Sequence, residues 1–171
     1  MGNPSDTLIN VFGALTIGVS DQVRSATSEG MALGGEATAA LVIIGHAPGL
    51  SIDRLGRVLR LSHPGTVRLV DRLTAGGLAE RRSAKHDRRA VALHLTETGE
   101  RQRGALLDRR QQVLSTMLVR IAPEDQAVLE RVSRTMLQGL ATDATSALTI
   151  CRFCNDQACA DCPMTVFDRM L

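Results

Sequence analysis

The stretch LSHPGTVRLVDRLTAGGLAERR, residues 61–82, decides the fold of this chain. Ser62 is a typical helix N-cap residue, and Pro64 stands in the first turn, where its missing N–H costs nothing. Apolar residues then recur at helical spacing until Gly76-Gly77, a pair that is typical of a helix end. The pattern predicts a helix over 62–75, with a change of period directly after it.

The segments on both sides of this helix fit the same unit. A second short helix precedes it, with Ser51 as its cap, and ends near residue 60. Two short helices joined by a tight turn make a helix-turn-helix, whose second helix enters the major groove of DNA. The pattern then changes to the alternation of apolar and polar residues that is typical of strands. It predicts two short strands, over 78–82 and 89–95, around a polar turn rich in arginine. The order predicts a helix-turn-helix followed by a basic wing.

Long helices flank this unit. The spacing of apolar residues predicts helices over 5–28, 36–47, 97–121 and from 123 onward. The apolar stripes of the first helix and of the last two are larger than a small winged domain can cover. We therefore expect these helices to pack against a second chain, with a larger monomeric core as the alternative.

The predicted fold is mostly α with a small β-hairpin wing: a winged helix-turn-helix with long dimerisation helices. We divide the chain of 171 residues into four parts. They are an N-terminal dimerisation helix (1–33), the winged helix-turn-helix DNA-binding domain (34–95), C-terminal dimerisation helices (96–146) and a Cys-rich tail (147–171).

Composition and charge narrow the class of protein. The chain is 44% hydrophobic and 22% charged, as in soluble globular proteins. No run reaches the roughly 18 apolar residues that span a bilayer, so we expect a cytoplasmic protein without membrane contact. Residues 51–110 hold fourteen Arg or Lys against seven Asp or Glu, whereas both ends are mildly acidic. A basic middle is typical of a nucleic-acid reader, and a solvated basic face is the alternative.

The sequence of residues 61–82, followed by Asp87-Arg88-Arg89 and by LTETG at 95–99, resembles the signature of the MarR family of winged helix-turn-helix transcription regulators. The resemblance covers roughly residues 5–146. It implies an obligate homodimer that binds a pseudo-palindromic operator in double-stranded DNA. Such regulators commonly repress their own or a neighbouring gene, and they release DNA when a small molecule or an oxidant acts.

The resemblance also implies which residues of the helix-turn-helix contact DNA. Ser62 and Thr66 would contact phosphate or base edges, and Arg68 is the first choice for reading a base. Arg72 would make either a phosphate contact or an ion pair on the helix surface. The residues expected on the recognition helix are Ser62, Pro64, Thr66, Arg68 and Arg72.

The wing supplies the other expected DNA contacts. Asp87 and Arg89 match the Asp-x-Arg element of the family, and Arg81 matches the Arg of the preceding strand. Asp87 can pair with Arg81 to brace the hairpin, which leaves Arg89 free to enter a narrow minor groove. A plain phosphate contact is the alternative for each arginine. The remaining basic residues of the wing are Arg82, Lys85 and Arg88.

The tail holds all four cysteines of the chain. The spacing is Cys151-x-x-Cys154-x4-Cys159-x-x-Cys162, and two Cys-x-x-Cys pairs can bind one structural Zn²⁺ tetrahedrally. In a reducing compartment this spacing favours a metal over disulfides. Redox thiols, disulfides and an iron–sulfur cluster use the same residues and stay open.

These patterns favour a DNA-binding regulator, most simply a repressor, over an enzyme. The chain has no nucleophile elbow, no Walker loop and no His-Glu-x-x-His motif. The alternatives are a winged-helix protein-interaction module, or a thiol- or metal-responsive sensor that does not act primarily through DNA. The small-molecule effector is unknown from the sequence. The resemblance implies a site for anionic aromatic molecules at the junction between the dimerisation helices and the winged domain. This junction would involve the first, second and fifth helices, with His46 as a candidate polar group.

Overall fold

The computed structural model describes residues 2–28, 34–83, 91–159 and 162–164. In these residues the fold is mostly helical with one two-stranded antiparallel hairpin, which confirms the predicted fold class. The elements are α1 (Asp6–Ser28), α2 (Gly35–His46), α3 (Ile52–Leu59), α4 (His63–Ala75), β1 (Ala79–Ser83), β2 (Val91–Leu95), α5 (Glu97–Leu118), α6 (Pro123–Leu140), α7 (Ala144–Cys151) and a 3-10 turn (Asp156–Ala158).

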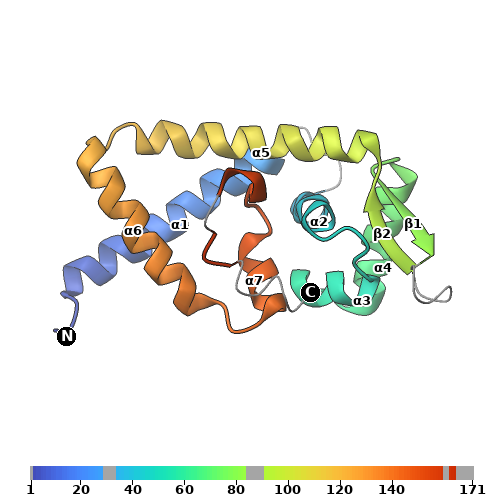
Figure 1. Cartoon of the computed structure of the whole chain (residues 1–171), viewed down its shortest axis with the longest axis horizontal. Helices are drawn as coiled ribbons and strands as arrows, with labels where there is room; N and C mark the ends of the chain where they lie inside the picture. Colours follow the sequence, from blue (N-terminus) through green and yellow to red (C-terminus); the bar gives the residue numbers. More distant parts are fainter. Residues whose placement is uncertain (1, 29–33, 84–90, 160–161, 165–171) are drawn as a thin grey trace.

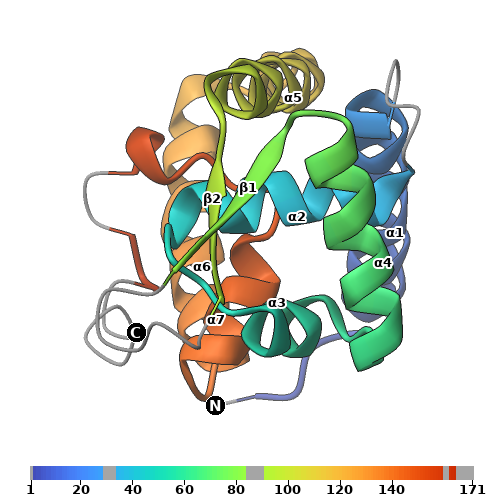
Figure 2. The same ribbon diagram turned by 90° about the vertical axis from the view of Figure 1, so that its right-hand side faces the viewer.

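The winged unit is built around α2, whose residues 37–44 are all buried. Helix α2 lies between the helix-turn-helix and α5 (Figures 1 and 2). The hairpin pairs Ala79 with Leu95 and Ser83 with Val91, and the bridge between Leu50 and Leu93 attaches the α2–α3 connection to it. The largest fully buried side chains of this core are aliphatic: Leu41, Ile43, Ile44, Leu55, Leu69, Leu73, Leu93 and Leu106.

Side-chain caps set the starts of the helices that shape this unit. The hydroxyl of Ser51 accepts a hydrogen bond from the backbone N–H of Arg54 at 3.2 Å, and that of Ser62 accepts one from Gly65 at 3.3 Å. Thr96 caps α5 in the same way. Each cap satisfies a backbone donor that the helix itself leaves unpaired. The predicted starts of α3, α4 and α5 are therefore confirmed.

The long helices extend away from the winged unit. Helix α5 runs along the top of the molecule in Figure 1, with α1 and α6 below its left half. Helix α6 has no buried residue in the single chain. Among the described residues, no helix is both long and apolar enough to cross a membrane. Large apolar side chains stay exposed on both outer helices: Leu8, Val11, Phe12 and Leu15 on α1, and Val128, Leu129, Val132 and Met136 on α6.

Helix α7 was not predicted from the sequence. Asp143 begins it with a capping box, in which its side chain accepts from the backbone of Ser146 and the Ser146 hydroxyl accepts from the backbone of Asp143. The hydroxyl of Thr149 donates to the carbonyl of Val58 on α3 at 2.9 Å, and Leu148 joins the core of the winged unit. The start of the tail, which we expected to form a separate part, is thus packed against the helix-turn-helix.

Candidate nucleic-acid interface

Helix α4 has one buried face and one exposed face. Among the residues predicted to contact DNA, Ser62, Pro64, Arg68 and Arg72 are exposed. Arg68 and Arg72 are four residues apart and therefore lie on the same side of the helix. The opposite face anchors α4 in the core through Leu69, Val70 and Leu73. The helix can present its arginines to a DNA groove while its position is held by packing.

Thr66 corrects the prediction for this helix. Its side chain is fully buried, and its hydroxyl donates to the backbone carbonyl of Ser62 at 3.0 Å. A Cβ added at Gly56 of α3 would lie only 2.7 Å from the Thr66 hydroxyl oxygen. Thr66 therefore sets the close approach of α3 and α4 and does not face the groove. The expected DNA contact at this position is therefore wrong, because the side chain points inward.

His63 connects the two helices of the helix-turn-helix at the surface. Its Nδ1 lies 2.7 Å from Oδ1 of Asp53, which is in the first turn of α3. Both side chains are mostly exposed, so the pair contributes little to stability. Its effect is to orient the start of α4, where Ser62 and Pro64 lie. The sequence analysis did not single out this pair.

Arg81 pairs with a residue of α4. Its Nη2 donates to Oδ1 of Asp71 on α4 at 2.6 Å, so strand β1 is joined to α4. The predicted partner, Asp87, lies outside the described residues, and so do Lys85, Arg88 and Arg89. The nearness of Asp71 and Arg81 follows from the tight turn between α4 and β1.

Arg82 is the last of the predicted contacts within β1. Its Nε donates to Oε1 of Glu80 at 3.0 Å, and both side chains are largely exposed. Arg81 and Arg82 thus continue the basic surface of α4 onto the wing. The described part of the interface contains four of the predicted arginines: Arg68, Arg72, Arg81 and Arg82.

The comparisons with known proteins agree with this geometry. Residues 33–90, which include α2, α3, α4 and β1, match the family model described as the MarR family. This part of the chain is therefore similar to the MarR family. No curated protein matches the chain closely enough to count as a relative.

Solved structures share the fold of this chain. A MarR family protein from Bacillus stearothermophilus is 24% identical with a TM-score of 0.71, and the match covers 80% of this chain and 94% of that one. RV1404 from Mycobacterium tuberculosis is 18% identical, with a TM-score of 0.69 and the same coverage. A point mutant of MepR from S. aureus, solved bound to an oligodeoxyribonucleotide, is 18% identical with a TM-score of 0.58, covering 80% of this chain and 100% of that one.

The tail of the chain contains a pair of interacting thiols. Cys151 ends α7, and the backbone N–H of Cys154 donates to its carbonyl at 2.8 Å. A side-chain hydrogen bond from Cys151 lowers the pKa of Cys154 to about 6, against the opposing effect of burial. The positive charges of Arg110 and Arg152 contribute to this lowered pKa, and the negative charge of Asp156 opposes it. Sequence analysis missed Arg110, because α5 brings it to the tail from far away in the chain.

The thiols do not gather as the spacing predicted. All four cysteines are described, none is in a disulfide, and no group of three or more His, Cys, Asp or Glu within the described ranges could hold a metal ion. Cys151 and Cys162 both pack against the apolar cluster of Ala141, Ala147 and Met164. Zinc at the tail stays a prediction, which stoichiometric metal analysis of protein purified under reducing conditions tests.

An acidic residue of the tail connects it to the core helices. Asp156 accepts a hydrogen bond from Nη2 of Arg103 at 2.7 Å, and Nε2 of His46 lies 3.4 Å from the same carboxylate oxygen. The Arg103 side chain is only 10% exposed, and a Cβ added at Gly45 would collide with it. His46, which we considered as an effector contact, is thus engaged with the tail, since it also contacts the carbonyl of Cys154.

Proposed function

We propose that this protein is a sequence-specific DNA-binding transcription regulator, and that it acts as a repressor on a pseudo-palindromic operator. One observation carries the proposal. Arg68 and Arg72 project from the exposed side of α4, whose opposite face is locked in the core, beside the arginines of β1. A rigid helix with a basic exposed side is what readout of base edges and phosphates requires.

The proposed DNA-binding unit is a homodimer. Helices α1 and α6 carry exposed apolar side chains, and α6 lies at the end of the molecule away from the wing (Figure 1). Exposed apolar surface on α1 and α6 favours burial against a second copy, because a two-fold interface uses the same patch twice. A dimer would present two α4 helices to two half-sites, as a pseudo-palindrome demands. The MepR mutant solved with an oligodeoxyribonucleotide supports DNA as the partner of this fold.

Release of DNA by a small ligand or an oxidant completes the proposal. Two features support it: a cavity lined by arginines at the end of α3, and the Cys151–Cys154 thiol pair, whose lowered pKa makes the thiolate available near neutral pH. Both features lie in or next to the segment after α6, and that segment packs on the helix-turn-helix through α3.

The test is binding of the purified protein to DNA from upstream of its own gene at two salt concentrations. We expect tighter binding than to random DNA, a steep loss with salt, and a cost of about 1–3 kcal/mol for Arg68→Ala. The matched control is Arg120→Ala, which removes the same exposed charge between α5 and α6, far from α4. Equal binding to random DNA, unaffected by Arg68→Ala, would contradict the proposal and favour a protein-interaction module.

A further inference from the structure

Two sulfur atoms meet where α7 ends. Cys151 is the last residue of α7, and the turn after the helix closes when the backbone N–H of Cys154 donates to the Cys151 carbonyl. This turn brings the two thiols together, and they share a hydrogen bond. Within the described residues, no third His, Cys, Asp or Glu joins them in a group that could hold a metal ion. An ion bound at this turn would therefore have two cysteine ligands.

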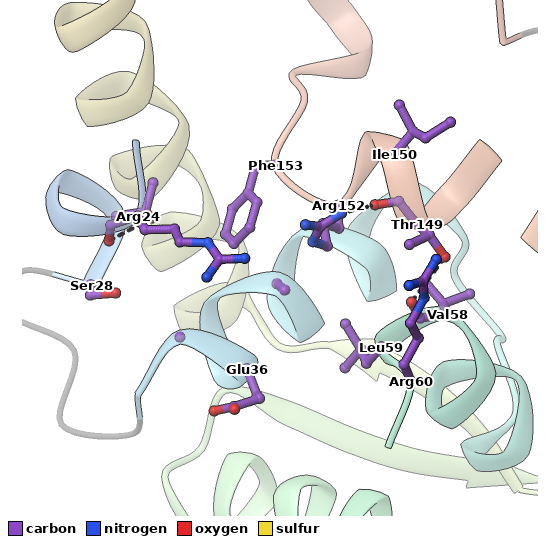
Figure 3. A pocket seen from close by; sticks show the side chains of 13 residues that line it. Arg24, Ser28, Glu36, Val58, Leu59, Arg60, Thr149, Ile150, Arg152 and Phe153 are labelled. Atoms are coloured by element: carbon purple, nitrogen blue, oxygen red, sulfur yellow. Dashed lines mark hydrogen bonds between the residues drawn. The ribbon is translucent and has the colours of Figure 1, made fainter. Parts of the chain in front are cut away.

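The turn between the two cysteines is anchored by the residues inside it. Figure 3 shows these residues, Arg152 and Phe153, at the cavity between α1, α2, α3 and α7. The Arg152 guanidinium donates to the carbonyl of Thr149 and lies against the Phe153 ring, with 5.7 Å between the guanidinium carbon and the ring centroid. Cys154 itself lines a different pocket, between α5, α6 and the tail. Because the intervening side chains are held elsewhere, the thiol pair is preorganised by the protein alone.

The nitrogen and oxygen donors next to the thiol pair are engaged with one another. Nε2 of His46 lies 3.1 Å from the carbonyl oxygen of Cys154 and 3.4 Å from Oδ1 of Asp156. The same carboxylate oxygen accepts a hydrogen bond from Arg103 at 2.7 Å. Imidazole and carboxylate are the ligands with which a zinc ion could complete a site that starts from two thiolates. With those donors engaged, the pair offers sulfur ligands.

The surroundings of the pair contain further sulfur and aliphatic carbon. Cys151 and Cys162 pack against the apolar cluster that contains Met164. Met164 is buried, and its backbone N–H donates to Sγ of Cys162 at 3.4 Å. Thiolates and thioethers are soft ligands, which select copper(I) over hard cations such as magnesium and calcium. The local chemistry therefore favours a soft ion.

Positive charge near the pair suits a complex with a net negative charge. Arg110 on α5 lines the same pocket as Cys154, and the charges of Arg110 and Arg152 both stabilise a thiolate at Cys154. The opposing effect of Asp156 is smaller, and Asp156 is itself paired with Arg103. Two thiolates and one monovalent ion together carry one negative charge. The arginines therefore favour such a complex.

We propose that Cys151 and Cys154 bind one copper(I) ion through their two sulfur atoms. Copper(I) suits this pair because it is soft, carries a single charge and is satisfied by two sulfur ligands, whereas a structural zinc site needs four ligands. On binding, two sulfur–copper bonds form and the thiol protons pass to the solvent, so neither sulfur nor copper changes its oxidation state.

The experiment is anaerobic transfer of copper(I) from its coloured bicinchoninate complex to the full chain, with a reductant that contains no thiol and without DNA. We expect each chain to withdraw one copper ion, which is measured as the loss of the colour of the probe. Loss of an outer-shell partner already costs about 10–100-fold in metal affinity. Removal of a direct ligand with Cys151→Ser or Cys154→Ser should therefore weaken binding by about 100-fold or more.

The matched control is Cys159→Ser, which removes an exposed thiol outside the pair and should leave copper binding unchanged. X-ray absorption at the copper edge of the loaded wild type tests the ligand set without any variant. Two sulfur neighbours are expected there, and three or four would overturn the assignment to this pair.

Three results of the transfer experiment would overturn the proposal. The first is that the wild type withdraws no copper from the probe, and the second is that Cys154→Ser binds copper as tightly as the wild type. The third is that Cys159→Ser loses as much affinity as Cys154→Ser, because the four cysteines would then act together. Since the experiment contains no DNA, a failure of operator binding would leave its outcome intact, and the two proposals fail separately.

Discussion

The helix-turn-helix and the segment after α6 differ in how their functional groups come together. In α3 and α4 the caps, the buried face and the exposed arginines all follow from residues three or four positions apart. In the tail, the charge of Arg110 helps to lower the pKa of Cys154, and Asp156 accepts a hydrogen bond from Arg103. The charges of Arg24 and Arg60 likewise help to lower the pKa of Arg152. In the first region the functional groups are positioned by the local periodicity of a helix. In the second they are positioned by contacts between segments that are far apart in the sequence. Variants can break each kind of organisation separately.

The largest effect is expected where the wing meets α5. A Cβ at Gly99 would lie 1.9 Å from the backbone carbonyl oxygen of Leu78, so Gly99→Ala must displace the turn that leads into the hairpin. We expect a loss of about 3 kcal/mol in the free energy of unfolding, measured by urea denaturation. Gly104→Ala is the matched control in the same helix, because nothing lies within 4 Å of its added Cβ. The control should gain up to about 1 kcal/mol in the free energy of unfolding, because alanine favours a helix over glycine. Equal effects of both changes would contradict the close contact between Gly99 and Leu78.

The next effect concerns the thiols of the tail. Removing the hydrogen-bond donor with Cys151→Ala should raise the pKa of Cys154 from about 6 toward its usual value of 9.0. The rate of alkylation of Cys154 by iodoacetamide at pH 7, followed by mass spectrometry, should fall by about tenfold or more. Cys159→Ala is the control. An unchanged alkylation rate in Cys151→Ala would show that the hydrogen bond from Cys151 does not cause the lowered pKa of Cys154.

The same shift predicts a dependence of stability on pH. The pKa of Cys154 is lower in the folded chain, so the contribution of its thiolate is complete above pH 9.0 and is lost as the pH falls to about 6. The difference in Tm between the wild type and Cys154→Ser should therefore grow as pH rises between these values. A constant difference would mean that folding does not perturb this thiol.

A smaller effect is expected at the contact between the tail and the core helices. Asp156→Asn removes the charge that pairs with Arg103, whose side chain is largely buried. We expect a loss of about 1–2 kcal/mol in the free energy of unfolding, the lower part of the range for hydrogen bonds to charged groups, because Asp156 itself is half exposed. Asp108→Asn removes an exposed carboxylate from α5 and should change stability little. Equal stability of the two variants would show that Asp156 does not hold the tail.

The smallest effect is expected at the surface pair that joins the wing to α4. Asp71→Asn should cost about 0.2–1 kcal/mol, because both partners are partly exposed. Its effect should vanish in a background that already carries Arg81→Gln, which a double-mutant cycle measures. Additive losses would show that Asp71 and Arg81 do not interact in solution.

The positions that sequence analysis placed correctly share a local cause. Ser51, Ser62 and Thr96 cap helices because their side chains reach backbone donors three residues ahead. Thr66 is the exception within the same helix. Its direction depends on the glycine of α3 that packs against it, and a pattern within α4 does not contain that information.

The sequence by itself therefore determined the class of fold, the order of its elements and the helix that carries the exposed arginines, since short-range periodicity and capping specify these. Only the tertiary structure decided that α7 packs on α3, that Arg81 pairs with Asp71, and that Arg24, Arg60 and Arg152 surround one cavity. The physical reason is distance along the chain. Contacts between segments far apart depend on how helices pack, and no spacing within one segment encodes them.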